Sequence, residues 1–414
     1  MLNRWNKLVA IAALALAMPV VANAQSSRVE GMALQGDYIK DYTSIYSYPS
    51  SVSQVGNLVY GEFGGGSDRA VGAVLGNLWE GRMGTWGVHL RRWDPSLGQA
   101  TTNSQPGIGV GGADLNANDN HSFDLMWGKR MGGTSVGLRI NRAFTETELS
   151  TATTQFTFND ADTNVFARNV FGVGFGVGFE INPSAMFEAG VLWQSRTFEN
   201  TITPIGGGTN SADDSPTSYQ LAARMMWQWQ PNVLVVPVFK WYSFDYSYKT
   251  TTGGLTSTRE ASQKGWQLGL AGNWTLNQND LFVLGLTAGN NTVEQDVDVF
   301  SSSVIGSGYK KMEETIYPQL FAALETHVNP WLTLRFGANQ DVNAKIKSDP
   351  IAITGGTPNS TISFSRFNME LGCGVKVGGL QFDAIMDSDF YNNFTQVSSE
   401  DAPGFGKVTA TYAF

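Results

Sequence analysis

Large apolar side chains alternate with glycine along residues 171–181. The odd positions from Phe171 to Ile181 are apolar, and glycine occupies positions 172, 174, 176 and 178. Because successive side chains of a β-strand point to opposite faces, this pattern predicts a strand with one apolar face and one nearly bare face. A row of glycines leaves room for another segment, such as a plug or a loop, to approach closely, or it lets the sheet bend. The pattern favours neither interpretation.

The same period of two recurs along the chain, over residues 135–144, 219–229, 266–274, 331–339, 366–376 and 380–390. Short connections rich in Gly, Pro, Asn and Asp, such as 131–133 and 182–184, are typical of tight turns. Long polar connections lie near residues 94–120, 148–163, 198–216, 249–262, 291–312, 346–361 and 390–403. Each predicted hairpin therefore has a tight end and a loose end.

This layout predicts an all-β fold, a transmembrane antiparallel up-and-down β-barrel with short periplasmic turns and long outer loops. Counting from 55–63 to 405–414 gives about sixteen strands, or about fourteen without the first hairpin, and both numbers are even as the rule requires. A soluble β-sandwich would show the same alternation. Strand segments longer than the usual length of about five or six residues favour the membrane barrel over the sandwich. So do tryptophans near the short turns, at positions 79, 229, 274 and 331.

The chain begins with a predicted secretory signal peptide, residues 1–24. Arg4 and Lys7 precede an apolar run, and Ala22-Asn23-Ala24 offers a cleavage site. Residues 25–54 form an N-terminal segment, a candidate plug, and residues 55–414 form the predicted barrel. No later apolar run is long enough for a transmembrane helix.

Composition excludes several classes of protein. The chain has 27 Lys and Arg, 36 Asp and Glu and a net charge of -9, without the basic patch that binds nucleic acid. Cys373 is the only cysteine, so no internal disulfide forms. Residues 114–119 resemble a calcium loop, but Asp119 stands where glycine is needed and Leu125 where a bidentate Glu is needed. We expect neither a metal nor a cofactor.

Signals for an enzyme are absent from the local sequence. The histidines at positions 89, 121 and 327 lie on separate segments, and none forms a nucleophile–base pair with an adjacent residue. We therefore expect that the protein is not an enzyme.

Strand parity assigns charged side chains of both signs to the lumen, where they set selectivity or form a wall network of cross-strand ion pairs. Arg366, Asp383 and Lys407 are the expected example of such a network. The lumen-lining candidates are Arg139, Arg196, Arg224, Arg335, Arg366, Glu370, Asp383, Asp387 and Lys407.

The chain ends KVTATYAF, with Val408, Ala410, Tyr412 and Phe414 on one face. This end resembles the closing-strand signal of Gram-negative outer-membrane β-barrels, which the barrel-assembly machinery reads. The resemblance implies location in the outer membrane of a Gram-negative bacterium and contact with outer-membrane lipid.

A second resemblance lies in Asp41–Val52, DYTSIYSYPSSV. It is similar to the segment before the first strand of the long-chain fatty-acid transporter family of outer-membrane barrels. The residues in comparable places are Asp41, Ile45, Tyr46 and Pro49. Tyr48 and Ser50 replace the Asn and Ala of that family's Asn-Pro-Ala. The resemblance implies an N-terminal plug and uptake of hydrophobic solutes.

Two functions follow from these features. The first is a porin-like channel for passive passage of small solutes. The charges of the lumen favour polar solutes, whereas the candidate plug favours hydrophobic ones. The second is a non-transporting barrel that acts as a secretion partner, an adhesin or a structural protein. The sequence indicates no oligomeric state.

Overall fold

The computed structural model describes most of the chain after residue 25. The described residues are 26–64, 69–76, 78, 81–91, 109–110, 113–114, 122–149, 161–204, 210–214, 217–245, 248–252, 255–277, 280–296, 309–350, 360–386 and 405–414. The predicted signal peptide lies outside these residues. Among the helices within them, none is long and apolar enough to span a membrane.

The described strands form one closed antiparallel β-barrel with sixteen strand positions, as predicted. The sheet contains 18 strands, of which the short β10 (Asn210–Asp214) and β13 (Tyr248–Thr252) continue β11 and β12. Pairing of β1 with β20, from Leu58↔Ala413 to Gly64↔Lys407, closes the barrel. The first hairpin is thus part of the wall, which excludes the alternative of fourteen strands.

The strands are β1 (Leu58–Gly64), β2 (Arg69–Leu75), β3 (Thr85–Arg91), β6 (Ser122–Met131), β7 (Thr134–Leu149), β8 (Ala161–Asn182), β9 (Ala185–Pro204), β11 (Thr217–Gln230), β12 (Val233–Asp245), β14 (Leu255–Thr275), β15 (Leu281–Asp296), β16 (Tyr309–Asn329), β17 (Leu332–Pro350), β18 (Ser360–Val377), β19 (Leu380–Met386) and β20 (Phe405–Ala413). A separate two-stranded ladder joins β4 (Gly109–Val110) and β5 (Ala113–Asp114).

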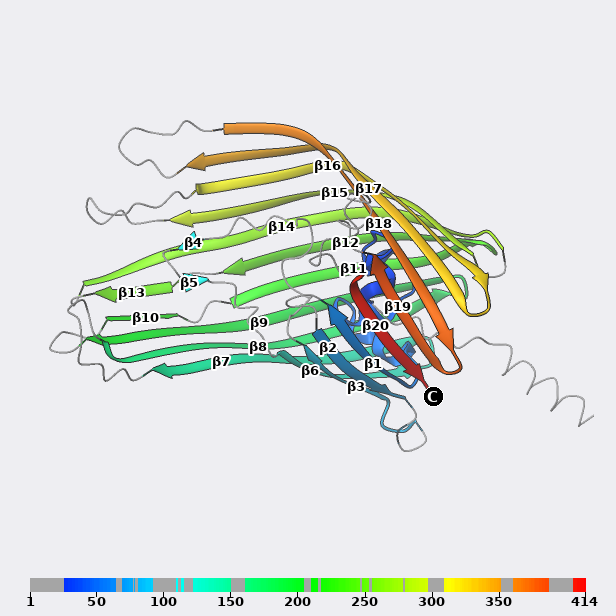
Figure 1. Ribbon diagram of the computed structural model, residues 1–414, viewed down its shortest axis with the longest axis horizontal. Coiled ribbons are helices and arrows are strands. Elements are labelled where there is room, and N and C mark those ends of the chain that lie inside the picture. Colours follow the sequence, from blue (N-terminus) through cyan, green and yellow to red (C-terminus); the bar gives the residue numbers. More distant parts are fainter. Residues whose placement is uncertain are drawn as a thin grey trace, which may run out of the picture.

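The described strands on one side of the barrel are shorter than those on the other side. Figure 1 shows short strands β1–β3, β19 and β20 beside long strands such as β8, β14 and β16, which extend away from the short turns. We call the two ends of the barrel the short-turn end and the long-strand end. Both the N-terminal segment and the C-terminus lie toward the short-turn end (Figure 1).

Strands extend further into the long connections than the sequence predicted. Residues 198–204, 255–262 and 346–350 belong to β9, β14 and β17, although they were expected in loops. The cause is that beyond the hydrocarbon both faces of a strand are wet, so hydrophobic alternation disappears while the hydrogen-bonded ladder continues. At the start of the barrel, β1 begins at Leu58 rather than at Val55, because Val55 caps a preceding 3-10 helix.

The two faces of the wall differ as strand parity requires. On β8, Phe171, Phe175 and Ile181 are exposed on the outer face. Along β11 the outer face runs from Tyr219 to Trp229, both exposed aromatics at opposite ends of an apolar stretch. Ten steps of about 3.3 Å at a tilt of about 40° give a height of about 25 Å, which matches the apolar band of outer-membrane barrels.

The N-terminal segment, residues 26–54, packs against the inner face of the barrel. It consists of α2 (Ser26–Glu30) and three 3-10 helices, η1 (Gly36–Tyr38), η2 (Tyr42–Tyr46) and η3 (Pro49–Gln54). Helix α2 lies against β18–β20, η1 against β12, and η3 against β6, β7 and β8. Most of its residues are buried.

Glycines on the inner face receive the backbone of this segment. Gly137, Gly176 and Gly190 are paired in one row across β7, β8 and β9. A Cβ atom at any of the three would overlap the backbone of Ser47–Ser50. The glycine row of residues 172–178 is therefore in part a docking surface, as the plug interpretation expected. Elsewhere in that row, Gly172 gives room to the Asn141 side chain.

Candidate functional site: the occupied barrel interior

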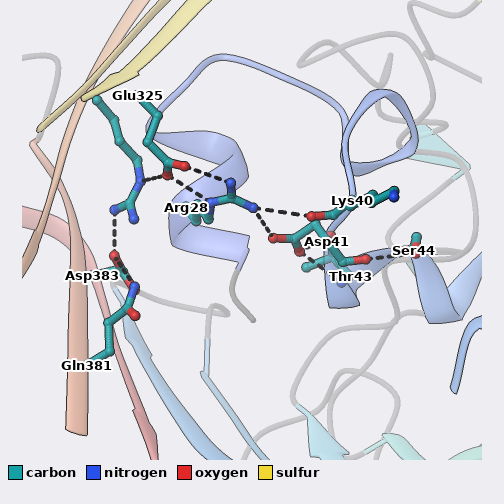
Figure 2. A network of polar contacts seen from close by, with 9 residues as sticks. Arg28, Lys40, Asp41, Thr43, Ser44, Glu325, Gln381 and Asp383 are labelled. Atoms are coloured by element: carbon teal, nitrogen blue, oxygen red, sulfur yellow. Dashed lines mark hydrogen bonds and ion pairs between the residues drawn. The ribbon is translucent and has the colours of Figure 1, made fainter. Parts of the chain in front are cut away.

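A chain of ion pairs connects the N-terminal segment to the barrel wall (Figure 2). The Arg28 guanidinium donates from Nε and Nη2 to the Glu325 carboxylate, at 2.8 and 2.7 Å. Its third nitrogen, Nη1, donates to Asp41 Oδ2 at 3.1 Å and to the Lys40 carbonyl at 3.4 Å. One arginine of α2 thus holds β16 on one side and the start of η2 on the other.

The chain of charges continues along the wall. Arg335 on β17 donates to Glu325 at 2.6 Å and to Asp383 on β19, whose carboxylate also accepts from Gln381 at 2.8 Å. Glu325 therefore accepts from two arginines. A buried charge is tolerated when it is paired and its remaining hydrogen-bonding capacity is satisfied, and this network meets that condition.

Asp41 and Arg28 respond differently to burial. Burial alone would lower the pKa of the Arg28 guanidinium, but Glu325 and Asp41 beside it raise that pKa above its ordinary value. For Asp41, burial dominates and raises the pKa of the carboxyl above 3.8, although Arg28 and the Thr43 backbone amide oppose the shift. Within the network, the charged form of Asp41 is therefore destabilised by burial more than its contacts stabilise it.

A second anchor lies on β9 and β11. Arg224 donates to Glu188 at 2.7 and 2.8 Å, to the Asp37 carbonyl at 3.1 Å and to the Ser44 hydroxyl at 3.0 Å. Its guanidinium also lies over the ring of Tyr48, 4.4 Å from the centroid. Arg224 thus contacts η1, η2 and the residue before η3. Ser51 and Gln54 of η3 donate to the same Glu188, at 2.9 and 3.1 Å.

A third anchor joins η2 to β3, β6 and β7. Arg139 donates to Asp124 at 2.7 Å and to the Tyr46 carbonyl at 3.4 Å. The hydroxyls of Tyr46 and Tyr60 both lie within hydrogen-bond distance of His89 Nδ1, at 2.5 and 2.9 Å. All of these side chains are buried. The described interior histidine is therefore part of a packing contact with the N-terminal segment.

Single contacts complete the attachment. Lys240 pairs with Asp37, Lys407 pairs with Glu30 at 2.9 Å, and Ser27 bonds to Thr409. These contacts add β12 and β20 to the strands already named. Charged contacts to the segment are thus distributed around the barrel circumference.

Most of the lumen-lining candidates turn inward, and five of the nine are buried: Arg139, Arg224, Arg335, Asp383 and Lys407. Arg366 is half-buried and pairs with Asp341 at 2.7 Å, and Glu370 is half-buried. The Arg196 side chain and Asp387 lie outside the described residues. The expected network of Arg366, Asp383 and Lys407 is wrong, because these residues pair instead with Asp341, Arg335 and Glu30.

Sequence reasoning missed the segment's residue in every ion pair that crosses to the wall, and it missed both residues of the pair Asp37–Lys240. Arg28, Asp37 and Asp41 precede the first strand, where no strand parity exists to place them. Asp124 could have been found, since it alternates with apolar neighbours on β6 as Arg139 does on β7. One feature of the sequence could have predicted these pairs. A short segment with charges of both signs precedes a barrel whose interior also carries charges of both signs.

Apolar contacts hold the segment as well. One buried cluster joins Val29, Met32, Leu34, Tyr38 and Ile39 to inward residues of β12, β14, β15 and β16. A second joins residues of η2 and η3 to inward residues of β1, β2 and β6. The interior therefore has apolar sectors between its ion pairs, which the expectation of a charged lumen did not include.

A third apolar cluster contains no residue of the N-terminal segment. Leu192 on β9 packs with Tyr242 and Phe244 on β12, and the two rings stack at 5.0 Å. The Tyr242 hydroxyl donates to Asn291 at 3.0 Å. Gly190, Ala222 and Lys240 form one inward-facing row across β9, β11 and β12, and this row contacts the N-terminal segment. Leu192, Tyr242 and Phe244 face inward from the rows that follow toward the long-strand end. We call these three residues the vestibule cluster.

The last strand places its final residues as parity requires. Lys407, Thr409 and Thr411 are buried on the inner face, while Tyr412 and Phe414 are exposed on the outer face and stack at 6.0 Å. Val408 and Ala410 alternate with these buried residues and therefore lie on the outer face with Tyr412 and Phe414. No group of three or more potential metal ligands occurs within the described part of the chain.

Comparisons with known proteins give structural neighbours only. No family model and no curated protein matches the chain. A FadL homologue of Pseudomonas aeruginosa is 12% identical, with 93% of this chain and 97% of that chain covered and a TM-score of 0.42. CymD, a monoaromatic hydrocarbon channel, is 8% identical, with 95% of this chain and 98% of that chain covered and a TM-score of 0.41. CdiB from Escherichia coli is 10% identical, with 86% and 62% covered and a TM-score of 0.41. Likeness at this level assigns no function to the chain.

Proposed function

We propose that this protein is an outer-membrane channel through which small hydrophobic solutes pass passively. The observation that carries the proposal is the vestibule cluster, which places large apolar side chains on the inner wall beyond the N-terminal segment. These side chains are only 1–5% exposed, so a solute would enter between them, where apolar surroundings favour solutes that lose their hydration.

The charges of the lumen do not favour a polar solute. Arg139, Arg224 and Lys407 are paired with carboxylates and contact the N-terminal segment, while Arg335 is paired with Glu325 and Asp383 of the wall. A paired and buried charge offers little field to a passing ion. The polar porin, which the sequence left open, is therefore the less supported form of the channel.

Solute uptake into proteoliposomes tests the proposal. Vesicles carrying the folded protein should take up a small aromatic hydrocarbon faster than protein-free vesicles. The protein should increase the uptake rate of a neutral sugar of similar size much less. The variant Phe244→Gln, which puts an amide in the vestibule cluster, should slow hydrocarbon uptake several-fold. Gln220→Leu lies in the same inward row as Leu192 and Tyr242 and should leave that uptake unchanged or faster. Equal rates with and without the folded protein would refute the channel.

One observation favours the second candidate, a non-transporting barrel. The N-terminal segment is attached to strands around the circumference by buried ion pairs, which is the arrangement of a closed lumen. Planar-bilayer conductance that stays at baseline, together with a stable partner in pull-down experiments, would support a secretion partner, an adhesin or a structural element instead.

Location and the absence of catalysis are parts of the proposal. Cell fractionation should place the mature chain in the outer membrane, with Gln25 as the first residue by mass spectrometry. No phospholipid hydrolysis should accompany it, and His89→Ala, His121→Ala and His327→Ala should leave uptake qualitatively intact. Hydrolysis that disappears in one of these variants would show an enzyme.

A further inference from the structure

The outer face of the barrel changes from apolar to polar at a set of aromatic residues toward the long-strand end. Trp193 is paired with Tyr219 across β9 and β11, and Trp241 with Trp266 across β12 and β14. Tyr219, Trp241 and Trp266 are 47%, 41% and 42% exposed. Tryptophan and tyrosine gather where hydrocarbon meets lipid headgroups. These residues therefore mark the headgroup level of the outer leaflet.

Lysines lie at and just beyond this level. Lys264 precedes Trp266 by two residues, which places it on the same face about 7 Å further along β14. The row that contains Trp266 reaches Lys345 on β17 through Asn290 and Thr315, and the row that contains Lys264 reaches Lys347 through Thr292 and Glu313. Three ammonium groups thus occupy adjacent rows on one stretch of the outer wall.

Carboxylates on this surface leave two of the lysines without a counter-charge. Glu294 accepts from Lys311 at 3.0 Å, and Glu313 lies 3.9 Å from both Lys311 and Lys347. Among the residues that the structure describes, neither Lys264 nor Lys345 forms an ion pair. Asp349 also lies beside Lys311 on this face, so three described carboxylates accompany four lysines there. In a chain with a net charge of -9, this stretch carries a local excess of one positive charge.

We propose that Lys264, Lys345 and Lys347 form a docking site for the phosphate groups of an outer-leaflet glycolipid. Lysine stems can lie along the apolar wall while the ammonium groups reach the headgroups, and clustered lysines at that depth attract anionic lipid. The occupant is a membrane lipid rather than a soluble phosphate, because the lysines continue the lipid-facing surface of Trp266. The proposal rests on the membrane-spanning barrel of the proposed function but not on solute transport.

Native mass spectrometry of the full detergent-solubilised chain tests the site. Diphosphorylated lipid A should be retained at least tenfold better than its dephosphorylated form, and inorganic phosphate should not compete at equal concentration. The triple variant Lys264→Gln, Lys345→Gln, Lys347→Gln should lose most of this preference. Lys376→Gln removes an exposed lysine near the short-turn end and is the matched control, which should keep it.

Each result bears on the site directly. Equal retention of the two lipids by the parent chain, or an unchanged preference in the triple variant, would overturn the proposal, and competition by inorganic phosphate would assign the lysines to a soluble anion. If the triple variant does not fold, the single variants Lys264→Gln and Lys345→Gln should each reduce the preference at least twofold. Solute uptake measured on the same preparations separates failure of the channel from failure of the lipid site.

Discussion

Arg28 and Glu325 are separated by 297 positions in the chain and form a two-point ion pair inside the barrel, with nitrogen–oxygen distances of 2.8 and 2.7 Å. Both side chains are 5% exposed. A pair of this geometry fixes both the position and the orientation of the guanidinium. It therefore sets where α2 sits against β16, and through Asp41 it also sets where η2 begins.

Removal of this arginine should release the N-terminal segment. Arg28→Gln leaves the Asp41 and Glu325 carboxylates buried with fewer donors, and loss of one partner of a buried pair costs about 3–5 kcal/mol. We expect residues 26–54 to become sensitive to protease in folded barrels and bilayer conductance to rise. The control is Arg130→Gln, which breaks the exposed Arg130–Glu180 pair at the short-turn end and should cost about 1 kcal/mol or less. A segment that stays protected in Arg28→Gln would show that its apolar contacts suffice.

The glycine row gives a steric test of the same attachment. In Gly137→Ala the new methyl group would overlap the Pro49 carbonyl, so the backbone of η3 must move, at a cost of about 1–3 kcal/mol for overpacking. Gly133→Ala is the matched control in the turn just before β7, because the nearest atom to its new methyl group would be Glu180 Oε2 at 3.4 Å. Protease sensitivity of the segment should increase only in the first variant, with little change in the heat-induced unfolding of the barrel in detergent.

The sequence predicted the barrel well and its contents poorly, for a physical reason. A strand that separates lipid from a lumen must alternate, so Phe171 and its outward neighbours reveal the wall and its sixteen strands. The same alternation assigns Arg224 and Arg335 to the inside, but it does not reveal their partners. Those partners lie in a segment of 3-10 turns that has no period, and contacts such as Arg28 with Glu325 join distant positions. Cross-strand partners such as Asp383 were therefore paired with the wrong cations.

The Asp41 carboxyl makes attachment of the segment depend on pH. Burial raises the pKa of this carboxyl above 3.8, so the folded state binds a proton more readily than the unfolded chain. A carboxyl whose pKa is raised by folding stabilises the folded state fully at pH values below the pKa of the unfolded chain. This stabilisation is lost as the pH rises through the pKa of the folded state. The segment should be more protected from exchange of its amide hydrogens in mildly acidic buffer than at pH 7, after correction for intrinsic exchange rates.

Asp41→Asn isolates that contribution. The amide oxygen can still accept from Thr43, whose amide and hydroxyl donate to Asp41 Oδ1 at 2.9 and 2.8 Å, and position 41 no longer buries a negative charge. The difference between parent and variant should therefore be small in acid and should grow toward pH 7 in favour of the variant. Identical pH profiles for the two proteins would contradict the assignment of the dependence to Asp41.

The exposed end of β20 leads to a prediction about assembly rather than stability. Phe414 is 59% exposed, so Phe414→Ala removes little buried surface and should change unfolding of the refolded barrel in detergent by about 1 kcal/mol or less. If the barrel-assembly machinery reads this residue, the same variant should lower the amount of heat-modifiable, membrane-inserted protein in cells several-fold. Phe382→Ala is the control, because Phe382 is a lipid-facing phenylalanine on the neighbouring strand, paired with Ala410. Equal losses in the two variants would mean that the cell senses lipid-facing bulk in general, and normal insertion of Phe414→Ala would show that the terminal phenylalanine is not a signal in this chain.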